Sequence, residues 1–329
     1  MKDSIVKLAQ NIIFALTIAA AVVFPLFFIP TTSEFFEYNK FFALLIITIL
    51  GLIIWSVKMI AEKRTVFTRT PLDAPLIIMG IIFLISAFSS IDQFISIYGV
   101  NGRIWPSIVP LITLFGFYFM AVSNIKNRKQ VNIIIYALVG ATTIASLVAL
   151  TSYFGAFLPF EFAKIRSFNT VGIINNLAII QTIVIPIAVS WGIYEKDRTS
   201  RIVATVSALI MALSFILINL LMAYVGLIVA LLFLGVGALK IRLTKSQQGH
   251  AAVIAVFIAL FLVIRFIPQV ATGTLYQWII SKDPGATQQQ QIDTPKQTKP
   301  SFQTAWDIAA QSIGKRPIVG TGLGTYQFV

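Results

Sequence analysis

The sequence predicts an all-α protein, a polytopic transmembrane helical bundle of about nine spans followed by the start of a large external loop. Hydrophobic residues make up 57% of the 329 residues and charged residues only 11%, less than half of the roughly 25% found in soluble domains. The mean hydropathy is +0.88. A chain of this composition cannot cover itself with polar surface, which excludes a soluble enzyme.

Long apolar runs recur along the chain, and about 20 such residues, at a rise of 1.5 Å each, cross a hydrocarbon core of roughly 30 Å. The predicted spans are Leu8–Ile29, Phe41–Ile60, Leu72–Ser89, Trp105–Ser123, Val131–Tyr153, Gly172–Tyr194, Ile202–Asn219, Leu221–Leu239 and Ala251–Pro268. The apolar run from Ile202 to Leu239 is too long for a single span. We therefore expect a tight turn near Asn219–Tyr224.

Basic residues of the short loops fall mostly on one side of this predicted bundle. Alternate loops, beginning with the N-terminus, hold fifteen Lys and Arg residues, whereas the opposite short loops hold four, namely Lys40, Arg103, Lys164 and Arg166. Loops rich in Lys and Arg are retained on the cytoplasmic side. The distribution therefore predicts a cytoplasmic N-terminus and an extracytoplasmic segment 269–329.

We expect two parts, a transmembrane bundle over 1–268 and an external loop segment over 269–329. Residues 281–300 are rich in Gln, Pro and Thr with almost no apolar residue, which is typical of a disordered linker. An amphipathic helix is predicted over 301–314, ending at Gly314. We expect Phe302 and Trp306 to pack this helix against the outer surface of the bundle.

The chain contains no Cys and a single His, His250. These counts exclude disulfide scaffolds, iron–sulfur clusters and thiolate or His-cluster metal sites in this sequence, so neither a metal nor a cofactor is expected. The net charge of +13 would favour a nucleic-acid partner in a soluble protein. In a membrane protein the distribution of charge matters more than its total, and no nucleic-acid partner is expected here.

Polar residues gather at the predicted outer face, before and at the start of the sixth span. Arginines at this level suit bidentate binding of phosphate or diphosphate. Since no nucleotide is expected outside the cytoplasmic membrane, a lipid-linked diphosphate is the natural ligand. The predicted diphosphate-binding residues are Arg166, Arg103, Asn169, Asn175 and Arg265.

For each of these residues the alternative is a purely structural role without a ligand. The amides would cap a helix or form hydrogen bonds between helices, and Arg166 would pair with Glu161 at the surface. Arg103 would extend along the interface beside Trp105, and Arg265 would do the same at the end of the ninth span.

A glycine-rich segment, Gly320-Thr321-Gly322-Leu323-Gly324, looks like a phosphate-binding loop. It is not a nucleotide fingerprint, because no strand–turn–helix unit surrounds it. Its glycines indicate a backbone that needs free φ angles or a close approach to a neighbour.

Three segments in this order resemble the O-antigen ligase and O-antigen polymerase family of membrane glycosyltransferases. Residues 96–103 (SIYGVNGR) resemble the family's S-x-x-G-x-x-x-R before a span. Residues 166–169 (RSFN) with 175–178 (NNLA) resemble its R-x-x-S/G-F-x-N-x-N-x-L-A. Trp306 in 305–309 (AWDIA), with Gly320, Gly322 and Gly324 in 316–326 (RPIVGTGLGTY), resembles the W-x-I-A … P-L-x-G-x-G-x-G-x-F of its large external loop.

The resemblance runs from about Leu72 to the end of the chain, and its last motif is the most specific. It implies metal-independent transfer of a glycan from a polyprenyl-diphosphate carrier to an acceptor, at the outer face of the bacterial cytoplasmic (inner) membrane. The acceptor would be lipid core, as in lipopolysaccharide synthesis, a growing polysaccharide or a protein. Family members bind the diphosphate with external arginines, and ligases activate the acceptor hydroxyl with a His of the external loop.

Two departures from the family pattern limit what can be carried over. The turn between the seventh and eighth spans reads LMAY at 221–224, without the family's Ser-Arg pair, and no external His is present. No catalytic residue is therefore assigned, and the family's length leads us to expect an N-terminal fragment, which would be inactive if the missing part is required. The alternative function is a lipid-linked sugar flippase or another transporter, which should carry polar clusters at mid-membrane and inverted repeats.

Overall fold

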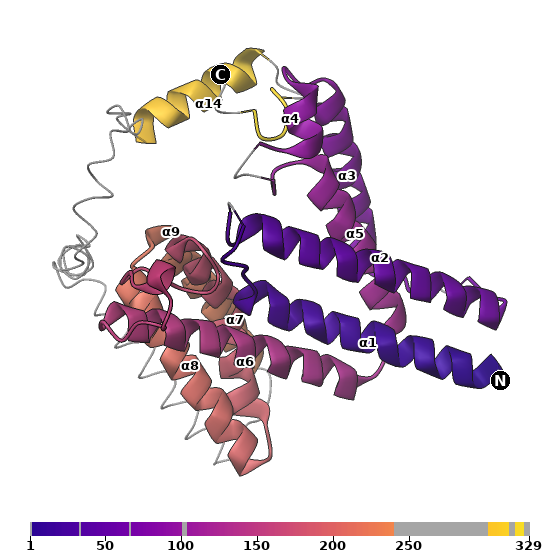
Figure 1. Ribbon diagram of the computed structural model, residues 1–329, viewed down its shortest axis with the longest axis horizontal. Coiled ribbons are helices and arrows are strands. Elements are labelled where there is room, and N and C mark those ends of the chain that lie inside the picture. The colour runs from indigo at the N-terminus through magenta and orange to yellow at the C-terminus, as the bar shows by residue number, and fades with distance from the viewer. Residues whose placement is uncertain are drawn as a thin grey trace. The chain divides into compact units, whose positions relative to one another are not determined.

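The computed structural model describes residues 2–32, 34–65, 67–100, 104–239, 302–315 and 320–325. Within these ranges the chain is helical and forms no β-strand, as predicted (Figure 1). The helices are α1 (Lys2–Leu26), α2 (Glu37–Glu62), α3 (Asp73–Phe88), α4 (Gln93–Tyr98), α5 (Ile108–Asn124), α6 (Arg128–Tyr153), the short 3-10 helix η1 (Glu161–Ala163), α7 (Ile174–Tyr194), α8 (Arg198–Ile218), α9 (Leu221–Leu239) and α14 (Phe302–Lys315).

Five of the described helices, α1, α2, α6, α7 and α8, are long and apolar enough to cross a membrane. The helices α3, α5 and α9 are apolar but shorter, with 16 residues in α3 and 17 in α5. Each of the first eight predicted spans therefore coincides with a helix, and several apolar helices of this kind indicate a membrane protein. The ninth predicted span and the predicted linker over 281–300 lie outside the described residues.

The predicted turn between the seventh and eighth spans is present and is tighter than expected. Helix α8 ends at Ile218, and Asn219 adopts the left-handed conformation with φ 55°. Its backbone N–H donates to the carbonyl of Phe215 at 3.1 Å, and α9 begins at Leu221. Asn tolerates this conformation better than most non-glycine residues, which explains why the long apolar run divides here.

The sequence predicts one bundle, whereas the structure groups the chain into two compact units. The first unit comprises residues 1–23, 31–131 and 294–329, and the second comprises 24–30 and 132–293. Each unit buries its own set of side chains, and the two are described separately below.

In the first unit, α1, α2 and α5 share a buried cluster formed by Ile13, Trp55 and Met120. Helices α2 and α5 approach closely at Gly51, where an added Cβ would lie 2.0 Å from the Met120 sulfur. Small residues permit such close approach between membrane helices.

The same two helices are also joined by a polar contact near their C-terminal ends. The Lys58 ammonium donates to the Asn124 amide oxygen at 2.8 Å, and both side chains are buried. Since a buried ammonium needs a hydrogen-bond acceptor, this contact fixes the alignment of α2 on α5.

In the second unit, α7 is the central helix and packs against α8 and α9. Gly192 of α7 faces Thr205 of α8, and Gly226 of α9 faces Thr182 of α7, with 3.2 and 2.9 Å between the added Cβ and the nearest threonine atom. The buried core comprises apolar side chains from α6, α7, α8 and α9.

A polar contact crosses three helices inside this apolar core. The Gln181 amide of α7 donates to the Ser146 hydroxyl of α6 at 2.8 Å and also to the Ser214 hydroxyl of α8. Both hydroxyls donate in turn to carbonyls of their own helices, those of Thr142 and Met211. Gln181 therefore forms hydrogen bonds to both α6 and α8.

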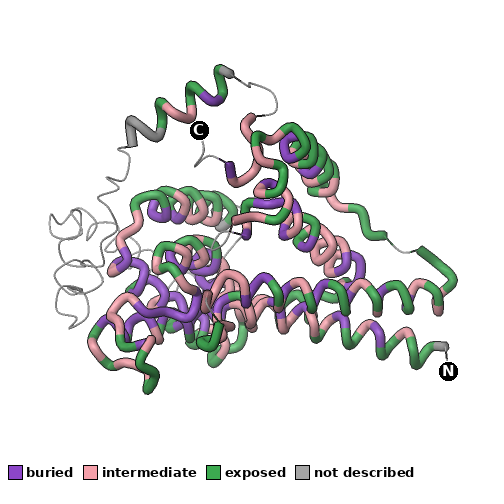
Figure 2. The backbone as a smooth tube through the Cα atoms, turned by 45° about the horizontal axis from the view of Figure 1, so that its top comes forward, coloured by how far each residue is buried: buried purple, intermediate pink, exposed green. Residues whose placement is uncertain are grey.

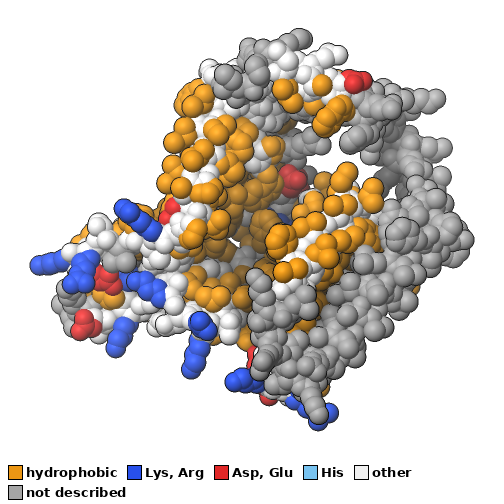
Figure 3. Space-filling model, turned by 180° about the vertical axis from the view of Figure 1, so that it is seen from behind, with side chains coloured by type: hydrophobic (Ala, Val, Ile, Leu, Met, Phe, Trp, Pro, Cys, Tyr) orange, Lys and Arg blue, Asp and Glu red, His pale blue; other side chains and the backbone are white. Residues whose placement is uncertain are grey.

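Each helix carries both buried and exposed positions along its length (Figure 2). The exposed positions of α3 and α9 are themselves apolar, and hydrophobic side chains continue across the surface in Figure 3. The exposed residues of α3 include Ile77, Ile78, Ile81, Ile82 and Ile85, and those of α9 include Val225, Val229, Leu232, Phe233 and Val236. Apolar faces this extensive are expected to contact lipid.

Helix α14 confirms the predicted helix over 301–314 and ends one residue later than expected, at Lys315. Trp306 is 68% exposed and Ile313 is 63% exposed. The docking of this helix onto the bundle stays a prediction. The side chain of Phe302 lies outside the described residues.

We predict that the contact between Gln181 and Ser146 contributes a measurable coupling free energy. Hydrogen bonds between membrane helices average about 0.6 kcal/mol and reach about 1.7 kcal/mol. A double-mutant cycle of Gln181→Met and Ser146→Ala, followed by unfolding in mixed micelles, should give a coupling in this range. Thr143→Ala is the matched control, because the Thr143 hydroxyl bonds only to Val139 of its own helix. Strict additivity of Gln181→Met with Ser146→Ala would contradict the observed contact.

Candidate functional site

The loop between α6 and α7, residues 154–173, is held by aromatic packing within the second unit. Phe28, Phe162 and Phe168 form a cluster of three rings with centroid separations of 5.9 to 6.0 Å, all in edge-on arrangements. Such arrangements are the favoured geometry for aromatic pairs. The hydroxyl of Thr170 also donates to the carbonyl of Pro25 at 2.8 Å, which ties the loop to the last turn of α1.

Asn169 supports this loop from the inside. Its amide nitrogen donates to the carbonyls of Ser167 and Gly172, and its amide oxygen accepts the backbone N–H groups of Val171 and Gly172 at 2.9 and 3.0 Å. The side chain is fully buried. Asn side chains often stabilise turns in this way, so the observed role of Asn169 is to shape the turn that leads into α7.

Arg166 lies on the same loop and folds toward the end of α6. Its guanidinium donates to the carbonyl of Tyr153, the last residue of α6, at 3.0 Å. Carbonyls at a helix C-terminus have no partner within the helix, and a cation there is favoured by the helix dipole. Glu161, the partner expected for Arg166 in the structural interpretation, forms an ion pair with Lys164.

The first turn of α7 follows directly after this loop. Ile173 stands at the N-cap position and provides no side-chain cap, so the first N–H groups of the helix are available to a polar ligand or to water. Asn175 is exposed in this turn. A helix N-terminus with exposed N–H groups favours an anion, and Arg166 adds a positive charge on the preceding loop.

The structure thus places Arg166, Asn169 and Asn175 on one loop–helix segment, with Asn169 inside it. Arg103 and Arg265 lie outside the described residues. No cluster of three or more His, Cys, Asp or Glu side chains that could hold a metal ion occurs among the described residues.

The glycine-rich segment docks onto the first unit, beside the short helix α4. The carbonyl of Thr321 accepts the backbone N–H of Ile91 at 3.1 Å and lies 3.3 Å from the Ser90 hydroxyl. The Ser96 hydroxyl donates to the carbonyl of Leu323 at 2.9 Å. These partners are separated by 231 and 227 residues in the sequence. Two motifs that are distant in the chain are therefore in direct contact.

Glycine is required at two positions of this segment. Gly322 has φ 112°, and an added Cβ would lie 2.0 Å from the Ser90 hydroxyl oxygen and 2.5 Å from its Cβ. Gly324 has φ 69°, and its Cβ would lie 3.1 Å from the carbonyl oxygen of Pro106. Any other residue would be strained in backbone conformation and would also lose the close approach.

The sequence indicated that these glycines serve a close approach, and it left the partner unassigned. Ser90 was missed, and Ser96 and the fully buried Thr325 were named only as members of family motifs, without a contact. Thr325 donates to the carbonyl of Gly322 at 2.8 Å and closes the segment on itself. Small hydroxyl side chains beside a capped helix, here Asp92 at the N-cap of α4, are the signal that could have pointed to this contact.

Comparisons of the chain with protein-family models, with curated protein sequences and with solved structures returned no match.

We predict that Gly322→Ala releases the glycine-rich segment from its site. The Ile91 amide, which bonds to Thr321 in the parent protein, should then exchange its hydrogen faster, as measured by hydrogen–deuterium exchange. Gly320→Ala is the matched control, because Gly320 also has a positive φ of 66° but nothing lies within 4 Å of its added Cβ. Gly320→Ala should lower the stability of the segment only by the backbone strain, about 1–2 kcal/mol. Unchanged protection of Ile91 in Gly322→Ala would show that the segment is not docked there.

Proposed function

We propose that the chain is a membrane glycosyltransferase of the O-antigen ligase and polymerase type. It transfers a glycan from a polyprenyl-diphosphate carrier to an acceptor at the outer face of the bacterial cytoplasmic membrane. The acceptor is lipid core, a growing polysaccharide or a protein, and membrane lipids surround the bundle.

The observation that best supports this proposal is the contact of Ser96 with Leu323. Ser96 begins one of the motifs by which the chain resembles the family, and Leu323 lies inside another. Two segments that resembled the family only by chance would not be expected to contact each other in the folded chain. A contact across 227 residues is what a functional external surface assembled from both motifs requires.

The second support is the polar segment that precedes α7. Arg166 carries a permanent positive charge, and its planar fork matches two phosphate oxygens. The exposed first turn of α7 offers further donors, since its N-cap residue provides no side-chain cap. In the proposed site, Arg166 contacts the diphosphate, Asn175 adds a neutral donor and Asn169 holds the loop in place.

The proposed topology follows the basic residues of the loops. With the N-terminus in the cytoplasm, the loop 154–173 and the glycine-rich segment both face outward, where the lipid-linked glycan is transferred. The inner ends of α7 and α8 then carry Lys196, Arg198 and Arg201, in agreement with the positive-inside rule.

The alternative is a lipid-linked sugar flippase. Transporters of this kind usually hold ionisable groups near the middle of the membrane. The polar contact in the core of the second unit is formed by Gln181, Ser146 and Ser214, which do not ionise. The two functions are separated by their products, because a transferase forms a new glycosidic bond and releases the polyprenyl diphosphate, whereas a flippase only moves the lipid across the bilayer.

We predict that Arg166→Lys and Arg166→Ala weaken the binding of a polyprenyl-diphosphate sugar to the purified full chain. A charge-assisted hydrogen bond contributes about 1.5–3 kcal/mol, which corresponds to roughly ten- to more than a hundredfold in affinity. Lys retains the positive charge but lacks the planar guanidinium, so Arg166→Lys should lose less binding affinity than Arg166→Ala.

Glu161→Ala is the control for this experiment, because the ion pair of Glu161 with Lys164 is exposed and is worth little. It should bind the lipid as the parent does. If both Arg166 variants remain folded and also bind as the parent does, Arg166 is a loop residue and not a ligand contact. A parent chain that binds no polyprenyl-diphosphate sugar would contradict the proposed function itself.

A further inference from the structure

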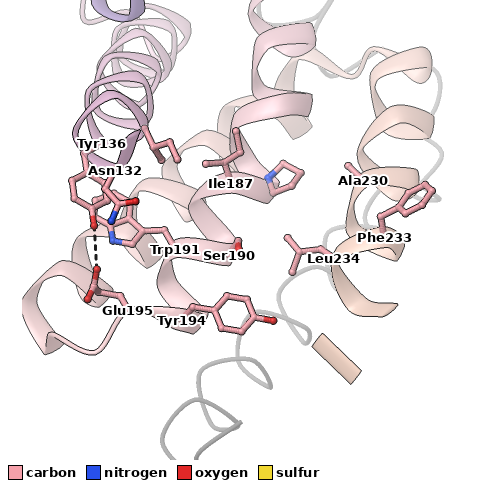
Figure 4. A pocket seen from close by; sticks show the side chains of 12 residues that line it. Asn132, Tyr136, Ile187, Ser190, Trp191, Tyr194, Glu195, Ala230, Phe233 and Leu234 are labelled. Atoms are coloured by element: carbon pink, nitrogen blue, oxygen red, sulfur yellow. Dashed lines mark hydrogen bonds between the residues drawn. The ribbon is translucent and has the colours of Figure 1, made fainter. Parts of the chain in front are cut away.

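A groove of about 700 Å³ opens on the second unit, at the opposite end of α7 from Arg166. It lies among α6, α7 and α9 (Figure 4). One wall is apolar, with Ile187 of α7 and Phe233 and Leu234 of α9. The other wall is polar and aromatic, with Tyr136 and Glu195. A groove with one apolar wall and one polar wall fits an amphiphile.

Glu195 is the anionic group of this groove. Its Oε1 accepts the backbone N–H groups of Lys196 and Asp197 at 2.8 and 3.3 Å, and its Oε2 accepts the Tyr136 hydroxyl at 3.2 Å (Figure 4). The bond from the Lys196 N–H is the main cause that lowers the pKa of Glu195, and burial opposes it only in part. A carboxylate has about four acceptor positions. Oε1 accepts two of these bonds and Oε2 accepts one, so a ligand would approach Oε2.

The carboxylate stands beside an aromatic surface. The ring of Tyr136 stacks on that of Trp191 with 4.2 Å between centroids and an interplanar angle of 23°. The indole N–H of Trp191 is buried and lies close enough to Glu195 to help lower the pKa of that carboxylate. Ring faces attract a cation. The same corner of the groove thus offers a carboxylate and two ring systems, a combination that suits an ammonium group.

The depth of the groove matches one leaflet of a bilayer. From Pro186 to Glu195, a rise of 1.5 Å per residue gives about 13.5 Å. This is close to half of a hydrocarbon core of roughly 30 Å. Glu195 lies at the end of α7 where the chain leaves the apolar helix, so an occupant would place its polar head at Glu195 and its apolar part toward Pro186.

We infer that this groove binds a phospholipid with a primary ammonium headgroup from the cytoplasmic leaflet. The ammonium donates a hydrogen bond to Glu195 beside the Tyr136 and Trp191 rings, and an acyl chain lies along Ile187 and Leu234. The lipid phosphate is balanced by Lys196 and Arg198, which are exposed and follow Glu195 closely in the sequence. This site requires a bilayer and the proposed orientation of α7, but it does not require glycan transfer.

The test is lipid binding to the purified full chain, followed by native mass spectrometry. Three probes with the same acyl chains are compared: phosphatidylethanolamine, phosphatidylglycerol and phosphatidylcholine. Phosphatidylethanolamine should bind about tenfold or more tightly than the other two, as expected for one charge-assisted hydrogen bond. Phosphatidylglycerol has no cation, and the phosphatidylcholine cation has no N–H to donate.

Glu195→Gln should remove most of this preference while the protein stays folded, because the Gln oxygen still accepts the Lys196 N–H and the Gln amide N–H can donate to the Tyr136 hydroxyl oxygen. Glu62→Gln is the matched control, since Glu62 ends α2 of the other unit and does not line the groove. Glu62→Gln should keep the preference for phosphatidylethanolamine. Equal binding of the three lipids by the parent, or an unchanged preference in Glu195→Gln, would overturn the assignment. Tight binding of phosphatidylcholine equal to that of phosphatidylethanolamine would also overturn it, because the ammonium N–H would then play no part.

Discussion

The structure depends on one constraint: a polar group inside the hydrocarbon core must be hydrogen-bonded within the protein. Helix α7 shows how the chain meets it for the N–H groups of the Gln181 side chain. Its 21 residues give a length of about 31 Å at 1.5 Å per residue, which matches the thickness of the core. The Gln181 amide donates to hydroxyls on both neighbouring helices. The groups that can act on a ligand are consequently found at the ends of the helix, at Arg166 and Asn175 on one side and at Glu195 on the other.

The positions of the helices could be predicted from the sequence because length and apolarity alone decide where a chain can cross a bilayer. The turn at Asn219 could be predicted for the same reason, since a single helix cannot use so long an apolar run. The division into two units could not be predicted. It depends on which side chains fit against one another, such as Gly51 against Met120 and Gly192 against Thr205, and hydropathy does not distinguish these faces from lipid-facing ones.

The candidate site was predicted in part. The sequence identified Arg166 and Asn175 by residue type and predicted side. It assigned Asn169 to a ligand, whereas its amide is occupied by four backbone hydrogen bonds. A buried Asn in a turn and an exposed Asn in a site look the same in a sequence, because the difference lies in the path of the backbone. Amphipathic spacing led to the expectation that Trp306 packs onto the bundle, but such spacing shows only that a helix has an apolar face, and not what covers that face.

Both functional inferences need α7 to run from the outside to the cytoplasm, and its orientation is the most direct test. The natural chain has no Cys, so single Cys variants can be labelled without background. Asn175→Cys and Lys196→Cys place a thiol at exposed positions at the two ends of α7. A membrane-impermeant maleimide added to intact cells should label Asn175→Cys and leave Lys196→Cys unlabelled until the membrane is opened. Labelling of Lys196→Cys alone would invert the topology and would contradict the outer diphosphate site and the inner lipid groove together.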